Sequence, residues 1–458
     1  MKVIVCGGGQ VGYNIAAYLS DEDNDVTVID NDPVRIAAIN EDLDVNGVVG
    51  HASSPDVLNA ANAKEADMLI AVTQLDEVNM VACQIGHSLF GIPKKIARIR
   101  DQSYLQPAWS NLFSRAHMPI DVIISPEVVI AEEVYKRLSV PGASFVSSLS
   151  GGLVHLLGVV FDENAPIINT PIGQIYSLFP DLSFKIVSII RNNEEIAPRL
   201  DEQILADDEV FFLVDTQHLK RVMVAFGKER DESRKIIIFG GGQVGYGLAK
   251  LLAPKGRGAQ VKIVEQSESR AQYLSESLDS GIVLHGSSLN KDVLKEAGIS
   301  SADTVVAVTN DDESNILSSL LAKQNGCGHV VTLVNNAAYS SLIGPLGIDT
   351  IVSPRSIIVS RIMQHVRRGR IKGLHSIRDG FSEVIEAEIS DVSKSVNMSL
   401  AELELSDGMM VAAVVRDDVV IIPEDDFVIR EDDHVIVVAT HEEASQVDNL
   451  FSVKVDMF

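Results

Sequence analysis

Two glycine-rich segments of this 458-residue chain are identical over seven residues. Gly7-Gly8-Gly9-Gln10-Val11-Gly12-Tyr13 occurs again as Gly240-Gly241-Gly242-Gln243-Val244-Gly245-Tyr246. The spacing Gly-x-Gly-x-x-Gly permits a tight turn, the close approach of a pyrophosphate to the backbone, and close packing of a helix on its strand. Unpaired N–H groups at the start of that helix can then bind phosphate charge. Each segment therefore predicts a nucleotide-binding turn.

A carboxylate follows each turn at the spacing that suits ribose recognition. Asp30 ends the next expected strand, and Glu265 takes the corresponding place in the second copy. Either side chain can accept hydrogen bonds from both ribose hydroxyls and repels a 2′-phosphate, so NAD(H) is favoured over NADP(H). ATP and ADP carry the same ribose and remain alternatives. A single match could be only a structural turn, but turn, acid and strand–helix context occur twice.

Polar residues also follow the fourth expected strand of each copy. They are Thr73 and Gln74 in the first copy, and Thr309 and Asn310 in the second. In a doubly wound sheet these strand ends flank the crevice where ligands bind, so the four residues are expected beside the adenosine or the phosphates. A purely structural polar strand end is the alternative. The nearby Asp76 and Asp312 are expected to cap the helices that follow.

Two arginines, Arg98 and Arg100, end the fifth expected strand of the first copy. Alternation places both on one face of that strand, where they could bind a phosphate bidentately. A solvated strand end is the competing interpretation. Their counterparts in the second copy are Leu333 and Asn335, so the two sites cannot be equivalent.

The surrounding elements predict how these residues are positioned. Short β-rich runs alternate with helical stretches, which is typical of parallel sheets covered by helices on both faces. In the first copy these runs are 3–5, 26–29, 48–49, 68–72, 96–99 and 122–124, and in the second 235–239, 261–264, 282–284, 305–308, 330–334 and 350–352. The predicted fold class is α/β, with two Rossmann-like doubly wound domains. Matching pairs such as Asn79/Asn315 indicate that whole domains are duplicated.

A smaller module with a different sequence pattern follows each Rossmann-like domain. Alternating strands at 209–214 and 434–438, with nearby turn signals, predict compact α+β modules. Ala206-Asp207-Asp208-Glu209-Val210 is similar to Glu431-Asp432-Asp433-His434-Val435. The predicted domains are 1–138, 139–228, 233–367 and 371–458. A polar linker from Lys228 to Lys235 and the segment Arg367-Arg368-Gly369-Arg370 mark two of the boundaries.

Composition limits the classes of function. A net charge of −26 and a pI near 4.7 argue against nucleic-acid binding and against binding to an anionic membrane surface. Cys6, Cys83 and Cys327 form neither a disulfide framework nor a zinc set, which favours a reducing cytoplasm. We expect no metal site and no membrane insertion. An oxidoreductase needs an acid or base beside its nicotinamide. We find no such catalytic group, because the candidate His51 is replaced by Ser287 in the second copy.

Longer stretches carry a family resemblance. They are Ala66-Asp67-Met68-Leu69-Ile70-Ala71-Val72-Thr73, Asn79-Met80-Val81-Ala82-Cys83, Ile96-Ala97-Arg98-Ile99-Arg100 and residues 120–126. With them the chain resembles, over essentially its whole length, the tandem RCK (KTN) nucleotide-binding regulatory subunits of bacterial Trk potassium-uptake systems. The resemblance implies that an RCK C-terminal domain follows each Rossmann domain. It also implies a non-enzymatic subunit that gates an integral-membrane potassium translocating subunit.

The same resemblance implies a ligand, an assembly and a location. The ligand is NAD(H) or ATP/ADP, the assembly is a homo-oligomer, and the protein is cytoplasmic, peripheral on the inner face of the cell membrane through its partner. The residues carried over are Gly7 to Val11, Asp30, Thr73, Gln74 and Arg98, and in the second copy Gly240 to Val244, Glu265, Thr309 and Asn310. Arg98 is the candidate sensor. A nicotinamide-dependent oxidoreductase and a scaffold with a vestigial second site are the competing classes.

Overall fold

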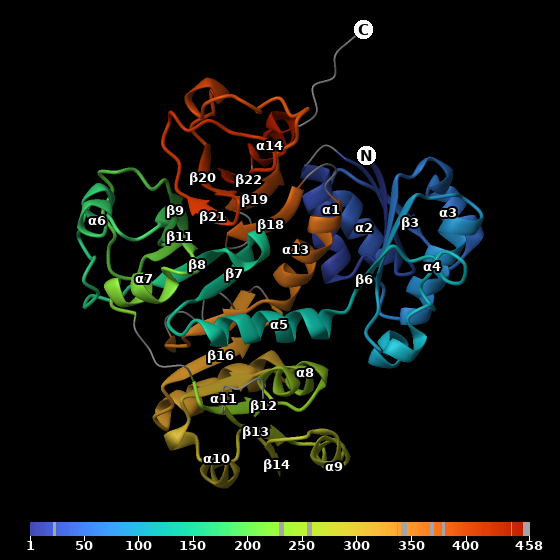
Figure 1. Ribbon diagram of the computed structural model, residues 1–458. Coiled ribbons are helices and arrows are strands. Elements are labelled where there is room, and N and C mark those ends of the chain that lie inside the picture. Colours follow the sequence, from blue (N-terminus) through green and yellow to red (C-terminus); the bar gives the residue numbers. More distant parts are fainter. Residues whose placement is uncertain are drawn as a thin grey trace. The chain divides into compact units, whose positions relative to one another are not determined.

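The computed structural model (Figure 1) describes residues 1–21, 24–228, 233–253, 259–336, 338–339, 346–366, 371–377, 381–440 and 442–451. These residues form two compact units. One is Met1–Ile130 with Pro354–Val366, and the other is Ala131–Ser353 with Arg367–Phe458. Part of the linker expected at 228–235, and all of the boundary segment 367–370, lie outside the described residues.

The first sheet is fully parallel, with the strand order β3-β2-β1-β4-β5-β6. Its strands are β1 (Lys2–Cys6), β2 (Asp25–Asp30), β3 (Asn46–Val49), β4 (Met68–Ala71), β5 (Lys94–Arg98) and β6 (Val122–Ile124). Its helices are α1 (Gln10–Asp21), α2 (Pro33–Asp42), α3 (Pro55–Ala60), α4 (Asp76–Ser88) and α5 (Pro126–Ser139). All strands run in the same direction, but the strand order reverses between β1 and β4, so the carboxyl ends of these two strands flank the crevice of a doubly wound sheet.

The second sheet repeats this topology as β14-β13-β12-β15-β16-β17. Its strands are β12 (Lys235–Phe239), β13 (Gln260–Glu265), β14 (Ile282–His285), β15 (Thr304–Ala307), β16 (His329–Leu333) and β17 (Thr350–Val352). The described helices are α8 (Gln243–Leu252), α9 (Glu268–Ser277), α10 (Lys291–Ala297), α11 (Asp312–Gln324) and α13 (Pro354–Val366). The two Rossmann-like folds predicted from the alternating pattern are confirmed.

An antiparallel five-stranded sheet follows each Rossmann fold. The first contains β7 (Phe145–Leu149), β8 (Val154–Val160), β9 (Phe184–Arg191), β10 (Glu194–Ile196) and β11 (Glu209–Asp215), with α6 (Ile172–Leu178) and α7 (Leu219–Ala225). The second contains β18 (Ile371–Ile377), β19 (Ser382–Glu388), β20 (Met409–Arg416), β21 (Val419–Ile421) and β22 (His434–Thr440), with α14 (Ala444–Leu450). The small α+β modules are therefore confirmed as well.

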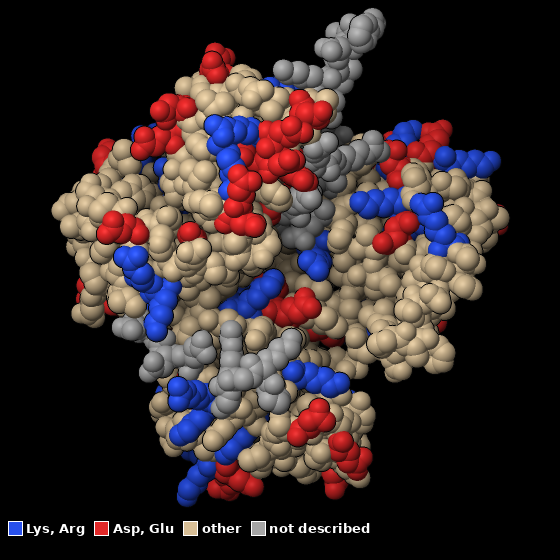
Figure 2. Space-filling model, viewed as in Figure 1, with Lys and Arg blue, Asp and Glu red and all other residues tan. Residues whose placement is uncertain are grey.

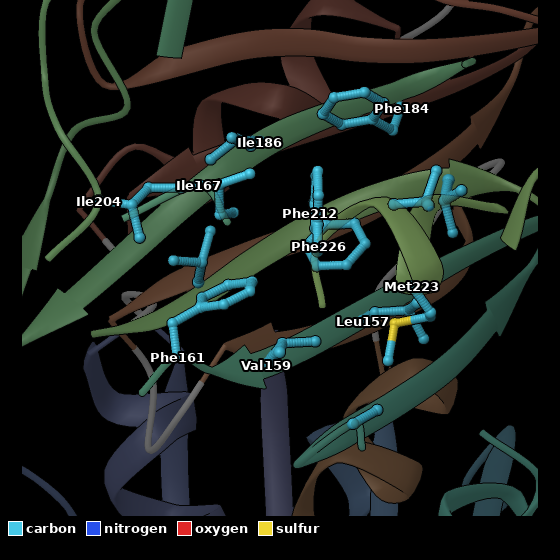
Figure 3. Close-up of a cluster of buried hydrophobic side chains, with 14 of the residues drawn as sticks. Leu157, Val159, Phe161, Ile167, Phe184, Ile186, Ile204, Phe212, Met223 and Phe226 are labelled. Carbon is cyan, nitrogen blue, oxygen red and sulfur yellow. The ribbon is translucent and has the colours of Figure 1, made fainter. Parts of the chain in front are cut away.

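Aromatic packing closes the core of the first small module (Figure 3). The buried ring of Phe226 contacts the rings of Phe184 and Phe212 edge-on, each at a centroid distance of 5.3 Å, and that of Phe161 at 6.0 Å. Phe226 directly follows α7, so these contacts attach the terminal helix of the module to its sheet. Edge-on aromatic pairs add modestly to the stabilisation that comes from burial alone.

A buried arginine–aspartate clamp explains the matching ends of the two small modules. Arg191 binds both carboxylate oxygens of Asp208 at 2.9 Å, and Arg416 binds both oxygens of Asp433 at 2.7 Å. Both aspartates have no exposed surface. Two parallel charge-assisted bonds offset the cost of removing each carboxylate from water. The repeated Asp-Asp sequence therefore marks a structural clamp in each module.

The last helix of each Rossmann copy, α5 in the first and α13 in the second, is assigned wholly or mostly to the unit that contains the other copy's sheet. Helix α13 follows β17 of the second sheet, but it contacts α1 and β6 in the first unit. Most of α5 belongs to the second unit, where Arg137 donates to the carbonyl of Ile351 at 2.5 Å. A side chain added at Gly247 in α8 would meet Ala131 of α5 at 3.3 Å. Each unit therefore contains a helix that follows a strand of the other.

Acidic side chains predominate on the face of the second small module shown in Figure 2. Among residues 381–440 the basic residues are Lys394, Arg416 and Arg430, set against many aspartates and glutamates. The charge of Arg416 is already paired with buried Asp433. An anionic surface repels phosphate groups at long range, so this face does not favour nucleic acid or anionic lipid.

Candidate nucleotide-binding sites

Glycine is required at two points of each glycine-rich turn. Gly7 has a φ of +110°, and a Cβ there would lie 3.0 Å from the backbone nitrogen of Thr73. A Cβ at Gly12 would lie 1.7 Å from the carbonyl oxygen of Gly7. The same restrictions hold at Gly240, with a φ of +99°, and at Gly245, where the distance is 2.0 Å. The turn therefore brings the end of β1 against the end of β4, and places Thr73 beside the glycines.

The middle of each turn is open. A Cβ added at Gly9 or Gly242 would meet no atom within 4 Å. The first N–H groups of a helix have no acceptor within that helix, and α1 and α8 begin immediately afterwards at Gln10 and Gln243. Val11 and Val244 follow in the same first turns. These open, donor-rich positions fit a pyrophosphate, whose oxygens accept hydrogen bonds from such groups.

The two acids hold their loops in the same way. Asp30 accepts from the backbone nitrogens of Gly8 at 2.7 Å and Asp32 at 2.9 Å. Glu265 accepts from those of Gly241 at 2.7 Å and Ser267 at 2.8 Å. The longer glutamate therefore makes the same pair of backbone bonds as the aspartate. Each carboxylate oxygen retains acceptor capacity, which ribose hydroxyls can use.

A buried asparagine positions each threonine. The Asn79 carbonyl oxygen accepts from the Thr73 backbone nitrogen at 2.9 Å and from its hydroxyl at 2.7 Å, and the Asn79 amide donates to the Arg98 carbonyl at 2.9 Å. Asn315 repeats these bonds with Thr309 at 2.9 and 2.7 Å. Sequence analysis missed both asparagines as site residues, although their identity in the two copies was a usable signal. Gln74 and Asn310 follow the threonines and are exposed.

The expectation that Asp76 and Asp312 cap their helices is wrong. Asp76 accepts from the backbone nitrogens of Arg100 at 2.9 Å and Asp101 at 2.8 Å, so it binds the loop after β5. Asp312 binds the corresponding loop of the second copy through the backbone nitrogens of Asn335 and Asn336. The neighbouring Asp311 caps α11. Asp76 and Asp312 are each the first residue of their helix, one position inside the N-cap, and the N-cap residue is the one placed to make the capping bond.

Arg98 and Arg100 have different surroundings. Arg100 pairs through its Nε with Glu127 at 2.9 Å, and its side chain is half exposed. Arg98 is partly buried, and its Nε has no hydrogen-bond partner among the residues that the structure describes. Burial, reinforced by the nearby Arg100 charge, lowers the pKa of Arg98. A desolvated cation with a free donor at the crevice edge favours an anionic ligand.

The equivalent edge of the second site has no such cation. Leu333 ends β16 and is buried, while the Asn335 side chain donates to Asp312 at 2.9 Å. The two sites therefore share the turn, the acid and the threonine, but differ where β5 and β16 end. No cluster of three or more metal-ligating side chains occurs within the described ranges. Over those ranges, every helix is too short or too polar to cross a bilayer.

These features define a class of protein: a chain of tandem Rossmann-type nucleotide-binding domains, each joined to a small antiparallel module. The fold is that of RCK domains. The crystal structure of the GsuK RCK domain matches with a TM-score of 0.61 at 17% identity, over 98% of this chain and 94% of that chain. The GsuK channel bound to NAD matches with a TM-score of 0.60 at 16% identity, over 98% and 78%.

Sequence comparison then identifies the family. The TrkA-N domain model matches residues 3–126 and 236–354, and the TrkA-C domain model matches residues 156–227 and 384–452. The Trk system potassium uptake protein TrkA of Azorhizobium caulinodans is 48% identical over the whole of both chains. That of Halomonas elongata is 41% identical, again over the whole of both chains. The chain belongs to the TrkA family of Trk-system potassium uptake proteins.

Proposed function

We propose that this chain is a nucleotide-binding regulatory subunit that gates an integral-membrane potassium translocating subunit of the Trk type. Family membership supports the link to potassium uptake. The oxidoreductase alternative is not favoured, because relatives that match over their whole length are named for potassium uptake. We also propose a homo-oligomer that is cytoplasmic and peripheral to the membrane through its partner. We further propose that the chain is divided into four domains, which span residues 1–138, 139–228, 233–367 and 371–458.

The proposed ligand is NAD(H), with ATP or ADP as the alternative. In the first site, Gly7 to Gly12 would hold the pyrophosphate and Asp30 the ribose, with Thr73 and Gln74 beside them. Arg98 is proposed to bind the negative charge of the ligand. The observation that carries this proposal is its partly buried guanidinium, whose Nε has no hydrogen-bond partner in the described part of the chain. Arg100 would contribute only if it left Glu127. One solved neighbour in fold, the GsuK channel, has been seen with NAD.

The second site is proposed to bind the same class of ligand with a different set of contacts. Gly240 to Gly245 would hold the pyrophosphate, Glu265 the ribose, and Thr309 and Asn310 would line the crevice. A ligand can shift a conformational equilibrium only through its different affinity for the two states. Two unequal sites on one chain therefore provide two distinct ways for a nucleotide to bias the partner.

The first test is a calorimetric titration of the intact protein with NADH and, separately, with ATP. Asp30→Ala removes the carboxylate that accepts hydrogen bonds from the first glycine-rich loop. We expect nucleotide binding at that site to weaken about tenfold or more. Asp25→Ala is the matched control, because Asp25 begins the same strand at the opposite edge of the sheet. Saturable binding that is indifferent to Asp30, or no binding of either ligand, would overturn the proposal.

Arg98→Leu tests the proposed sensor. It places at the end of β5 the residue type that the second copy carries at Leu333, so the fold is expected to tolerate it. We expect the variant to fold and to lose the nucleotide response of potassium uptake in cells that carry the partner. Leu333→Arg is the reciprocal variant. An unchanged response in Arg98→Leu would refute the sensor role.

A further inference from the structure

We propose that Arg270 is the phosphate-binding cation of the second nucleotide site, taking the role that Arg98 has at the first. The inference rests on the proposed nucleotide-binding function and adds to it a residue that the sequence patterns did not reveal. It also implies that the second site is a working ligand site, and that its positive charge comes from α9 rather than from the end of β16.

The first argument is that Arg270 holds the phosphate-binding loop directly. Its Nε donates to the carbonyl oxygen of Gly241 at 2.7 Å, while Glu265 accepts from the nitrogen of the same residue at 2.7 Å. Gly241, the residue before the open position Gly242, is therefore hydrogen-bonded through both its carbonyl and its amide. A loop fixed in this way before binding loses less conformational freedom when the ligand arrives.

The second argument is that two aromatic rings orient the guanidinium. The central carbon of Arg270 lies 4.8 Å from the ring centre of Tyr273 and 5.7 Å from that of Tyr246. These two rings are 6.0 Å apart. Tyr246 is the last residue of the duplicated segment and lies in the first turn of α8. Stacking on aromatic faces is a typical way for proteins to fix arginine without neutralising it.

The third argument is an unsatisfied donor. The Nη2 of Arg270 is buried, and it has no hydrogen-bond partner in the part of the chain that the structure describes. Buried donors without partners are rare, and each one points to a missing acceptor. At the first site, the Nε of Arg98 is likewise a buried donor without a hydrogen-bond partner among the described residues. Within the described residues, each candidate site thus has an arginine with a buried, unpaired nitrogen, although the two arginines come from different elements.

Comparison with the first copy shows that the contacts of Arg270 with the loop and with two rings are specific to the second site. Arg35 occupies the position of Arg270, but its side chain is 48% exposed and turns toward Asp30 at 3.8 Å and Asp32 at 3.5 Å. Ala38 stands where the second copy has Tyr273, so the second ring is missing. The second copy also has Ser267 where the first has Asp32, so Arg270 has neither that acidic partner nor the exposed position of Arg35.

The test is calorimetry of the intact chain with ADP as the probe, in an Asp30→Ala background that weakens the first site. Remaining saturable binding then reports on the second site. We expect added Arg270→Ala to weaken ADP binding about tenfold or more, and Arg270→Lys to restore part of the loss because it keeps the charge. Lys250→Ala is the matched control. The Lys250 ammonium lies 4.3 Å from the Tyr246 ring centre, and its loss is expected to change ADP affinity less than about twofold.

Adenosine separates phosphate recognition from a merely structural role. It has the same base and ribose but no phosphate, so Arg270→Ala is expected to leave adenosine binding within about twofold of its value. Tyr273→Leu is a second variant that removes the orienting ring, and it should weaken ADP binding several-fold without touching the loop. Equal losses of ADP and adenosine, or no loss of ADP, would overturn the inference.

The outcomes also separate this inference from the proposed function. If wild-type protein binds ADP but the Asp30→Ala chain does not, the second site is inactive and only the inference fails. If wild-type protein binds no nucleotide, the proposed function and the inference fail together. If binding persists in Asp30→Ala and is lost with Arg270→Ala, both are supported.

Discussion

Replacing Asn79 by alanine tests the network that positions the first site. The side chain has no exposed surface and makes four hydrogen bonds. It accepts from the nitrogen and hydroxyl of Thr73, and it donates to the Thr73 carbonyl at 3.2 Å and the Arg98 carbonyl at 2.9 Å. The substitution therefore leaves partly buried backbone groups at the ends of β4 and β5 without these partners.

The expected magnitude follows from these lost bonds. An intramolecular hydrogen bond contributes about 1 kcal/mol net, and a buried group left unsatisfied costs about 1–3 kcal/mol. Partial relaxation and water entry reduce the total, so we expect the local opening free energy at the β4 end to fall by about 2–4 kcal/mol. Because about 1.4 kcal/mol corresponds to a factor of ten, amide exchange should accelerate roughly 30- to 700-fold.

Hydrogen exchange followed by mass spectrometry measures this effect in peptides that contain Thr73. Asn315→Ala should accelerate exchange at Thr309 by a similar factor, because the corresponding bonds have nearly the same lengths. Gln84→Ala is the control on the same helix, since its amide donates to the exposed Ser88 hydroxyl and does not bond a strand end within the described residues. Acceleration below about threefold in Asn79→Ala, or an effect in one copy alone, would refute the reasoning.

Three further predictions follow from the same structure. Gly9→Ala should leave stability within about 0.5 kcal/mol, because its Cβ meets no atom within 4 Å, yet abolish nucleotide binding at the first site by filling the phosphate position. Burial raises the pKa of the Cys6 thiol to about 12 from 9.0, so stability present below pH 9 should be lost as pH rises from 9 toward 12. Asp208→Ala should destabilise the first small module by about 2–3 kcal/mol, because it removes two charge-assisted bonds from Arg191, which keeps its ion pair with Glu202 at 3.1 Å.

Each of these has a measurement and a control. Calorimetry and urea unfolding of Gly9→Ala are compared with Gly12→Ala, which should unfold the turn because its Cβ would lie 1.7 Å from a carbonyl oxygen. The alkaline loss of stability should be smaller in Cys6→Ala than in wild type, and equal losses would contradict the assignment. Exchange protection of β11 reports on Asp208→Ala, and a change below about 1 kcal/mol would count against the clamp.

Much of the site follows from local sequence. The turns need glycine because of a positive φ at Gly7 and Gly240 and a contact at Gly12 and Gly245 that excludes any side chain. The acids lie at strand ends because alternation and spacing place them there. The alternation of strand and helix patterns predicted the parallel sheets, and the small modules were predicted from their own strand pattern. The duplication aligned the two copies residue by residue, so the candidate site of one copy predicted the corresponding residues of the other.

Other features depend on residues that are distant in sequence. The position of α13 against α1 is decided by which apolar faces meet when the chain folds, and a helix carries the same amphipathic pattern whichever sheet it covers. The identity of Asn79 with Asn315 was visible, but their bonds across two strand ends were not. Arg270 contacts Tyr273 on its own helix, but Gly241 and Tyr246 come from the glycine-rich segment more than 20 residues earlier. The sequence by itself determined the elements and the residue types at their ends, whereas only tertiary packing decided which buried donors have no hydrogen-bond partner among the described residues.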